Sequence, residues 1–188
     1  MNDDALRQRN RNRIALLAIF ALFFGMFALA GVLRFTGWKP EGSQNKGEML
    51  DPPGDLRQLQ VTLADGTAYP WAPIERTWRV VVAPKPGCTT ECVQLLDRLD
   101  LVWQLMGREA DRVHILWVGE FPAGGKRDPA LRIAADSAAL RAGLPRSDDP
   151  AGTPVYLVDP NGFVVLRYAP GFDPGHLRYD LAKLLKLK

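Results

Sequence analysis

The longest unbroken run of apolar positions lies near the start of the chain. Residues 14–33 read IALLAIFALFFGMFALAGVL, 20 positions without a charged side chain. A helix of this length rises about 30 Å, the thickness of the hydrocarbon core of a bilayer. Because the segment also lacks a polar face, it does not match the surface helix of a soluble domain. We expect a transmembrane anchor. The alternative is a cleaved signal peptide, with the small-x-small pattern Ala28-Leu29-Ala30 before Gly31.

The residues on either side of this span predict its orientation and the domain boundaries. Residues 1–13 form a basic tail with four arginines, whereas the basic residues after the span are widely spaced. The positive-inside bias therefore favours a cytoplasmic N-terminus and an exported C-terminal part. Residues 34–55 are rich in Gly, Pro and polar side chains, which is typical of a linker. Residues 56–188 remain for a single folded domain.

Within residues 56–188 the apolar pattern predicts an ordered series of strands and helices. In chain order these are a β-hairpin over 59–69, a strand over 78–83, a helix from 88 to 106, a strand over 112–118, a helix over 128–142, a β-hairpin with strands 154–158 and 163–168, and a helix over 174–187. Asn161-Gly162 supplies the turn of the second hairpin. Strand, helix and strand in succession form a βαβ unit. This order predicts an α/β fold: a thioredoxin-like mixed sheet of four or five strands flanked by helices, with an N-terminal β-hairpin extension.

Composition and charge narrow the range of functions. The chain has 188 residues and a formal net charge of +3. Residues 1–13 hold four of the 24 basic and two of the 21 acidic side chains, which leaves the rest of the chain at +1. The domain therefore lacks the charge expected for a nucleic-acid partner. Two cysteines also exclude a disulfide-dense small scaffold.

The two cysteines stand at the predicted junction between a strand and a helix, in the motif Cys88-Thr-Thr-Glu-Cys92. Unpaired N–H groups and the helix dipole favour a thiolate at a helix N-terminus. We therefore expect Cys88 to be the attacking or more exposed sulfur. The pair can close a disulfide or offer two soft sulfurs to one metal ion. Two buried structural cysteines, or a purely structural disulfide, are the alternatives.

The domain resembles the Sco-type proteins of cytochrome c oxidase assembly, within the thioredoxin superfamily. The CxxxC spacing of Cys88 and Cys92 is similar to theirs, and so are the stretches 117–122, 126–129 and 156–162, over a similarity that runs from about Leu56 to the C-terminus. The resemblance implies a membrane-anchored domain in the bacterial periplasm. It also implies copper held by Cys88 and Cys92, and a client such as an oxidase subunit or a copper chaperone.

Two positions depart from this family pattern. Val93 follows the second cysteine, where family members usually carry a proline, and Ala151 stands where they carry a histidine copper ligand. Of the two histidines in the chain, His114 lies within an apolar strand and is expected to be a core residue, and His176 is expected at the surface. A three-ligand copper site is therefore not expected, although two thiolates suit Cu(I).

A further resemblance involves Pro154. The sequence Gly152-Thr153-Pro154-Val155 is similar to the cis-proline segment of TlpA-type oxidoreductases, which lies opposite the cysteine pair. An ordinary trans proline at the start of a strand is the alternative. Together, these features suggest either a thiol–disulfide oxidoreductase that uses Cys88, Cys92 and Pro154, or a non-enzymatic assembly factor that binds copper or only its client.

Overall fold

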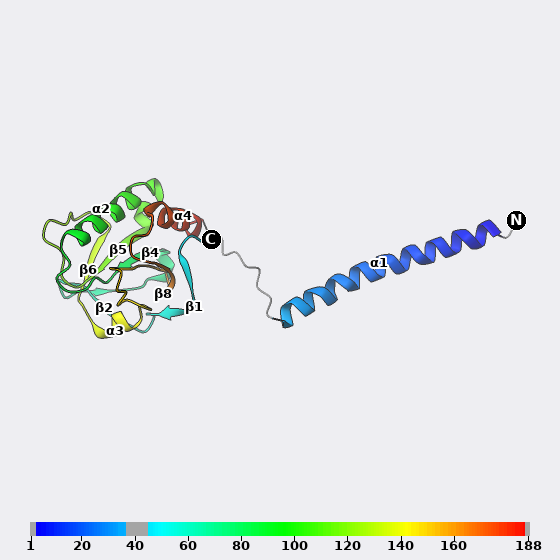
Figure 1. Ribbon diagram of the computed structural model, residues 1–188, viewed down its shortest axis with the longest axis horizontal. Coiled ribbons are helices and arrows are strands. Elements are labelled where there is room, and N and C mark those ends of the chain that lie inside the picture. The colour runs from blue at the N-terminus through cyan, green and yellow to red at the C-terminus, as the bar shows by residue number, and fades with distance from the viewer. Residues whose placement is uncertain (1–2, 37–44, 187–188) are drawn as a thin grey trace. The chain divides into compact units, whose positions relative to one another are not determined.

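The chain forms two compact units, residues 1–42 and residues 43–188. The structure, a computed structural model, describes residues 3–36 and 45–186 (Figure 1). Its elements are, in order, α1 (Asp3–Phe35), β1 (Glu48–Asp55), β2 (Val61–Thr62), β3 (Ala68–Tyr69), the 3-10 helix η1 (Pro73–Glu75), β4 (Trp78–Val82), α2 (Thr90–Gln104), the 3-10 helix η2 (Gly107–Arg112), β5 (Val113–Val118), β6 (Leu131–Ala134), α3 (Ala138–Ala142), β7 (Val155–Val158), β8 (Phe163–Tyr168) and α4 (Pro174–Leu184).

The first unit contains one long helix. α1 has 33 residues and includes both the apolar run and part of the basic tail. Its large apolar side chains are exposed to the surroundings, with Leu22 at 70% and Phe23 at 60% of their full accessible area. In length and composition, residues 7–35 suffice to cross a membrane, a test that an N-terminal signal sequence also passes.

The second unit is built on a six-stranded mixed sheet of order β1-β8-β7-β4-β5-β6. β4, β5 and β6 run parallel to one another, and β7 and β8 are antiparallel to their neighbours. Alternate residues of the central strands point to opposite faces of the sheet. One face packs against α2 and α4, and the other against the β2–β3 hairpin and α3 (Figure 1). The predicted mixed sheet, the N-terminal hairpin, the βαβ unit and the closing hairpin are confirmed, but the sheet has six strands instead of the expected four or five.

The helix expected over residues 128–142 is wrong. Residues 131–134 instead form β6, which pairs with β5 through partners such as Ile115 and Leu131. The open edge of β5 offers a row of main-chain groups to this segment, and side-chain periodicity over so short a stretch does not reveal that partner. Only α3, at the end of the expected helix, is helical, and the side chain of Ser137 caps it.

The sheet also begins earlier than expected, because residues 48–55 of the expected linker form β1. This strand pairs with β8 at the edge of the sheet, with a shift of register between Met49 and Gly54. Pro52 and Pro53 are compatible with an edge strand, which needs fewer main-chain donors than a central one. Apolar alternation is nearly absent here because most of β1 is exposed.

Candidate functional site

The cysteine pair lies where β4 passes into α2. β4 ends at Val82, a loop runs through Gly87, and α2 begins at Thr90. Gly87 has φ +79°, a backbone conformation that glycine adopts at little cost, and this turn brings Cys88 toward the helix. Cys88 and Cys92 form a disulfide, with 5.8 Å between their Cα atoms.

The two sulfur-bearing residues differ in burial. Cys92 is fully buried, at 0% exposed area, and packs in the core beneath α2, whereas Cys88 is partly exposed. The expectation that Cys88 would be the more exposed cysteine is therefore confirmed. Cys88 precedes the first residue of α2, Thr90, by two positions, so the disulfide connects the loop to the first turn of the helix.

The N-terminus of α2 has no side-chain cap. Thr89 occupies the cap position, but its hydroxyl accepts no hydrogen bond from the helix. Val93 N donates to Thr89 O, over 3.1 Å, as the helix starts. The free N–H groups of the first turn form the positive end of the helix dipole, and they lie close to the cysteine pair. This position favours the thiolate form of a cysteine.

A cavity of about 370 Å³ opens beside Cys88. Its walls come from the cysteine loop, from the loop after β5, and from α3 with the segment before it, and they include Lys85, Cys88, Glu120, Phe121 and Arg141. Trp117, which is fully buried, holds the loop after β5 in place by donating from Nε1 to the Glu120 carbonyl over 2.9 Å. The partly exposed cysteine therefore lines a shaped, accessible space.

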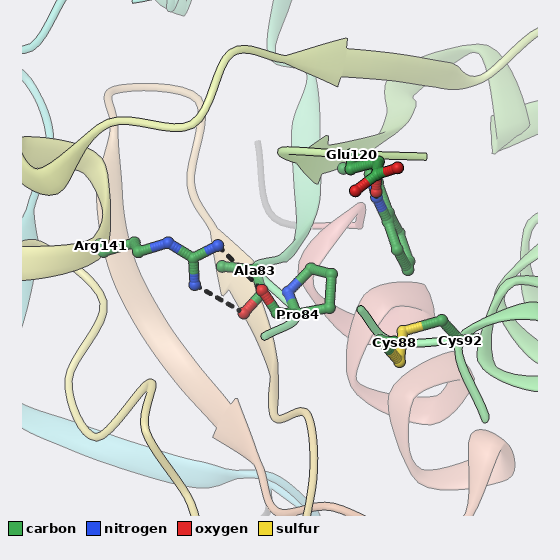
Figure 2. The surroundings of a disulfide bond; sticks show 7 residues. Ala83, Pro84, Cys88, Cys92, Glu120 and Arg141 are labelled. Atoms are coloured by element: carbon green, nitrogen blue, oxygen red, sulfur yellow. Dashed lines mark hydrogen bonds between the residues drawn. A yellow bond between two sulfur atoms is a disulfide. The ribbon is translucent and has the colours of Figure 1, made fainter. Parts of the chain in front are cut away.

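Arg141 fixes the backbone that leads into the cysteine loop. Its guanidinium donates to the carbonyls of Ala83 and Pro84, at 3.2 and 2.8 Å (Figure 2). The same group is paired with Asp136, whose Oδ1 lies 2.7 Å from Nε. Sequence reasoning missed both residues. An arginine within an expected helix is usually solvated, and nothing in the pattern marked these two carbonyls as its acceptors.

Pro154 directly precedes β7, the strand that pairs with β4. It is buried at the start of β7, where Val155 pairs in register with Val82 at the end of β4. The preceding Gly152 is close to Glu91, since a Cβ placed on it would come within 2.7 Å of the Glu91 carboxylate. The expected cis bond is wrong. The one cis peptide bond among the described residues precedes Pro52, and the trans bond at Pro154 is compatible with a proline that opens a strand.

Ionic contacts hold the loop that carries Pro154. Arg167, almost fully buried, pairs with the Asp149 carboxylate. The Ala151 N–H and Arg167 both lower the pKa of Asp149, with the larger effect from the Ala151 N–H. On the other side, Lys85 Nζ of the cysteine loop donates to the Asp149 carbonyl over 3.2 Å. Asp149 therefore joins the two loops that meet at the disulfide.

The histidines and Ala151 do not complete a metal site. His114 was expected in the core but is only partly buried, and its Nδ1 lies 2.7 Å from the Tyr69 hydroxyl. His176 lies on the exposed side of α4, and Ala151 is exposed. Among the described residues, no three His, Cys, Asp or Glu side chains are grouped so that they could hold a metal ion. The residues present do not fit a three-ligand copper site.

Comparison with known proteins identifies the family. Residues 78–188 match a family model described as a transmembrane-like, thioredoxin-like, C-terminal domain. The chain belongs to this family. The matched region of this thioredoxin-like protein begins with β4 and includes the disulfide, Arg141 and Pro154. A search of curated proteins found no match.

Solved structures share the fold at low sequence identity. BsSco, described as a member of the Sco family of cytochrome c oxidase assembly proteins, is 13% identical over 76% of this chain and 98% of its own, with a TM-score of 0.53. Yeast Sco1 with copper bound is 13% identical over 78% of this chain and 96% of its own, with a TM-score of 0.52. A SCO1/SenC family lipoprotein from Bacillus anthracis is 15% identical over 73% and 99%, with a TM-score of 0.51. These similarities extend to the fold alone.

Proposed function

We propose that this protein is a membrane-anchored, Sco-related factor that assists cytochrome c oxidase assembly by thiol–disulfide exchange through Cys88 and Cys92. One observation carries the proposal: a disulfide joins a partly exposed cysteine at a cavity to a fully buried cysteine in the first turn of a helix. A disulfide with only a structural role does not require this difference in burial between its two cysteines. Its five-residue loop also contributes little to stability, because loop-entropy stabilisation grows with loop length.

The proposed reaction uses the two sulfurs in sequence. In the reduced protein, the Cys88 thiolate attacks a client disulfide and forms a mixed disulfide, while the other client sulfur leaves as a thiolate and takes up a proton. Cys92 then gives up its proton and attacks the Cys88 sulfur, which releases the second client thiol. Two electrons and two protons pass to the client, and the Cys88–Cys92 disulfide remains. The reverse sequence oxidises a client dithiol.

The surrounding residues have defined parts in this proposal. The uncapped start of α2 stabilises the attacking thiolate. Arg141 and Asp149 are positioning residues, because they hold the backbone of the two loops at the disulfide. Pro154 begins the strand beside the cysteine loop, and we propose that the backbone before it faces the client chain during exchange.

The anchor determines where the exchange takes place. α1 is long and apolar enough to span a bilayer, and the four arginines at its start favour a cytoplasmic N-terminus. We propose a single-pass protein of the bacterial inner membrane with the thioredoxin-like unit in the periplasm. Its clients are then membrane proteins with exported cysteines, such as a copper-site subunit of the oxidase or the chaperone that delivers copper to it.

A second candidate function is a non-enzymatic assembly factor that binds copper or only the client protein. The proximity of the two cysteines, with 5.8 Å between their Cα atoms, favours it, because reduction would leave two neighbouring soft thiolates that suit one Cu(I). In this candidate function, Ala151→His adds a third ligand to the two thiolates and raises Cu(I) affinity. Competition with a chromogenic Cu(I) chelator measures this, and an unchanged affinity would show that position 151 does not face the sulfurs.

Alkylation kinetics of the reduced protein test the exchange chemistry. We expect Cys88 to react with iodoacetamide at neutral pH at least about tenfold faster than Cys92, since thiolate fraction and access both favour it. The variants Cys92→Ala and Cys88→Ala report each sulfur separately, and the denatured chain supplies the common reference rate. Equal, slow rates for both sulfurs would leave the binding factor as the better account.

A further inference from the structure

A second cleft lies away from the disulfide, between η1, η2 and the C-terminal ends of α2 and α4. It has a volume of about 680 Å³. Five basic side chains line it: Arg76, Arg108, Arg112, Arg178 and Lys186. Glu75 and Glu109 are its acidic residues, which leaves a net charge of +3. Over residues 43–188 the basic and acidic side chains are equal in number, so the cleft concentrates positive charge in a unit that has no net charge overall.

Three of these cations have no partner in the described part of the chain. Glu109 is engaged by Arg112 at 2.8 Å and by Arg108 at 3.6 Å. The side chains of Arg76, Arg178 and Lys186 make no hydrogen bond or ion pair to a described residue, although their main chains do. Unpaired cations around a concave surface favour a negatively charged ligand.

Apolar side chains lie among these cations. Leu105 and Met106 contribute to the cleft, and Leu105 is 52% exposed. Ile74 does not line the cleft but lies in the 3-10 helix η1, directly before Glu75 and the capping Arg76, and is 96% exposed. Isolated exposed apolar residues are common on protein surfaces. Exposed apolar side chains next to basic ones, however, are typical of surfaces that bind the interface of a bilayer.

The chain that comes from α1 enters the domain at the helix that lines this cleft. The Asp180 carboxylate of α4 accepts hydrogen bonds from Lys46 N and Gly47 N, at 2.8–3.0 Å. Arg178 and Ala182, two residues to either side of Asp180, line the cleft. Residues 36–45 are the only residues between α1 and this attachment in the sequence, and ten residues span at most about 36 Å.

We propose that this cleft binds the headgroup of an anionic phospholipid in the bilayer that holds α1, an inference that rests on the proposed membrane anchor. Arg76, Arg178 and Lys186 face the phosphate, and Leu105 and Ile74 contact the glycerol and the first acyl carbons. Binding would hold the domain against the membrane surface, close to clients that are themselves embedded in it.

Depth-dependent fluorescence quenching in nanodiscs tests this contact. Because the two native cysteines are joined in a disulfide, a cysteine introduced by Ile74→Cys can be labelled with bimane without reduction. The full chain is placed in neutral phosphatidylcholine nanodiscs, or in nanodiscs with about 30% phosphatidylglycerol, each with doxyl-labelled lipid. We expect quenching at position 74 to rise at least about twofold with the anionic lipid and to disappear in about 0.5 M salt. The reference label is Ala64→Cys, in the β2–β3 turn on the other face of the sheet (Figure 1).

Charge reversal identifies the residues responsible. Arg178→Glu with Lys186→Glu should abolish the extra quenching at position 74. The matched control, Lys126→Glu with Arg127→Glu, makes the same change of net charge outside the cleft and should keep it. Equal quenching at positions 74 and 64, or quenching that ignores lipid charge, would overturn the inference, as expected if an acidic protein were the real occupant. A chain that fails to incorporate into nanodiscs would instead contradict the anchor, and the inference with it.

Discussion

His114 should make the stability of the domain depend on pH in a range where few other groups titrate. Arg79, almost fully buried, donates from Nε to the Tyr69 hydroxyl over 3.0 Å. A neutral His114 with an unprotonated Nδ1 accepts the Tyr69 proton over 2.7 Å, whereas a protonated ring would have to donate to a hydroxyl oxygen that already accepts from Arg79. Burial, followed by the charges of Arg132 and Arg79, lowers the pKa of His114 to about 4.

The size of the effect follows from the two pKa values. An unfolded chain binds a proton at His114 with a pKa of about 6.5, so between pH 6.5 and 4 the unfolded state holds more protons than the folded state. The free energy of unfolding therefore falls as the pH falls through this window. At 1.36 kcal/mol per pKa unit, the loss between pH 7 and pH 5 is about 2 kcal/mol.

Denaturant titration of the detergent-solubilised protein at several pH values measures this loss. Tryptophan fluorescence suits the purpose, because all five tryptophans lie outside α1 and so report on the other parts of the chain. His114→Gln retains an acceptor for Tyr69 but does not titrate, so it should lose about 2 kcal/mol less than the native protein between pH 7 and 5. Identical pH profiles for the two proteins would refute the network as the source of the dependence.

Two more substitutions test the contacts that hold β1 and the cysteine loop. Asp180→Asn leaves the Lys46 and Gly47 amides and the Tyr168 hydroxyl to share a weaker acceptor, and urea unfolding should show a loss of about 2 kcal/mol, larger than for Tyr168→Phe. A loss confined to Tyr168→Phe would contradict this account of Asp180. Arg141→Met removes both donors from the Ala83 and Pro84 carbonyls and should cost about 2 kcal/mol while changing the alkylation rate of Cys88. Arg141→Lys should restore part of both effects, and an unaltered alkylation rate in Arg141→Met would show that Arg141 does not position the loop.

The elements whose conformation is determined by their own local sequence could be predicted. Local sequence pattern predicts three kinds of element: the apolar run over residues 14–33, the buried strands β4 and β5, and the Asn161-Gly162 hairpin. β1 and β6 do not. Each is an edge strand whose conformation depends on a neighbour distant in the sequence, β8 for one and β5 for the other. Local periodicity contains no information on such partners.

Some residues of the candidate site could likewise be predicted from the sequence, and others could not. Cys88, Cys92 and the position of Pro154 could be found from motif and order, because sheet topology brings the end of β4 and the start of β7 together. Arg141, Asp136 and the Arg167–Asp149 pair could not be found. Their partners are carbonyls and carboxylates on other segments, and an arginine in a sequence gives no sign of whether it is solvated or bound to a backbone.

Trapping of mixed disulfides tests the proposed exchange chemistry most directly. Full-length Cys92→Ala and Cys88→Ala variants are expressed in bacteria, thiols are blocked at harvest, and membranes are separated on non-reducing gels. With the resolving sulfur removed, Cys92→Ala should accumulate adducts that a reductant dissolves, whereas Cys88→Ala, left with only the buried sulfur, should accumulate few. The absence of adducts from both variants, together with equal losses of stability, would contradict the account and leave a structural disulfide in its place.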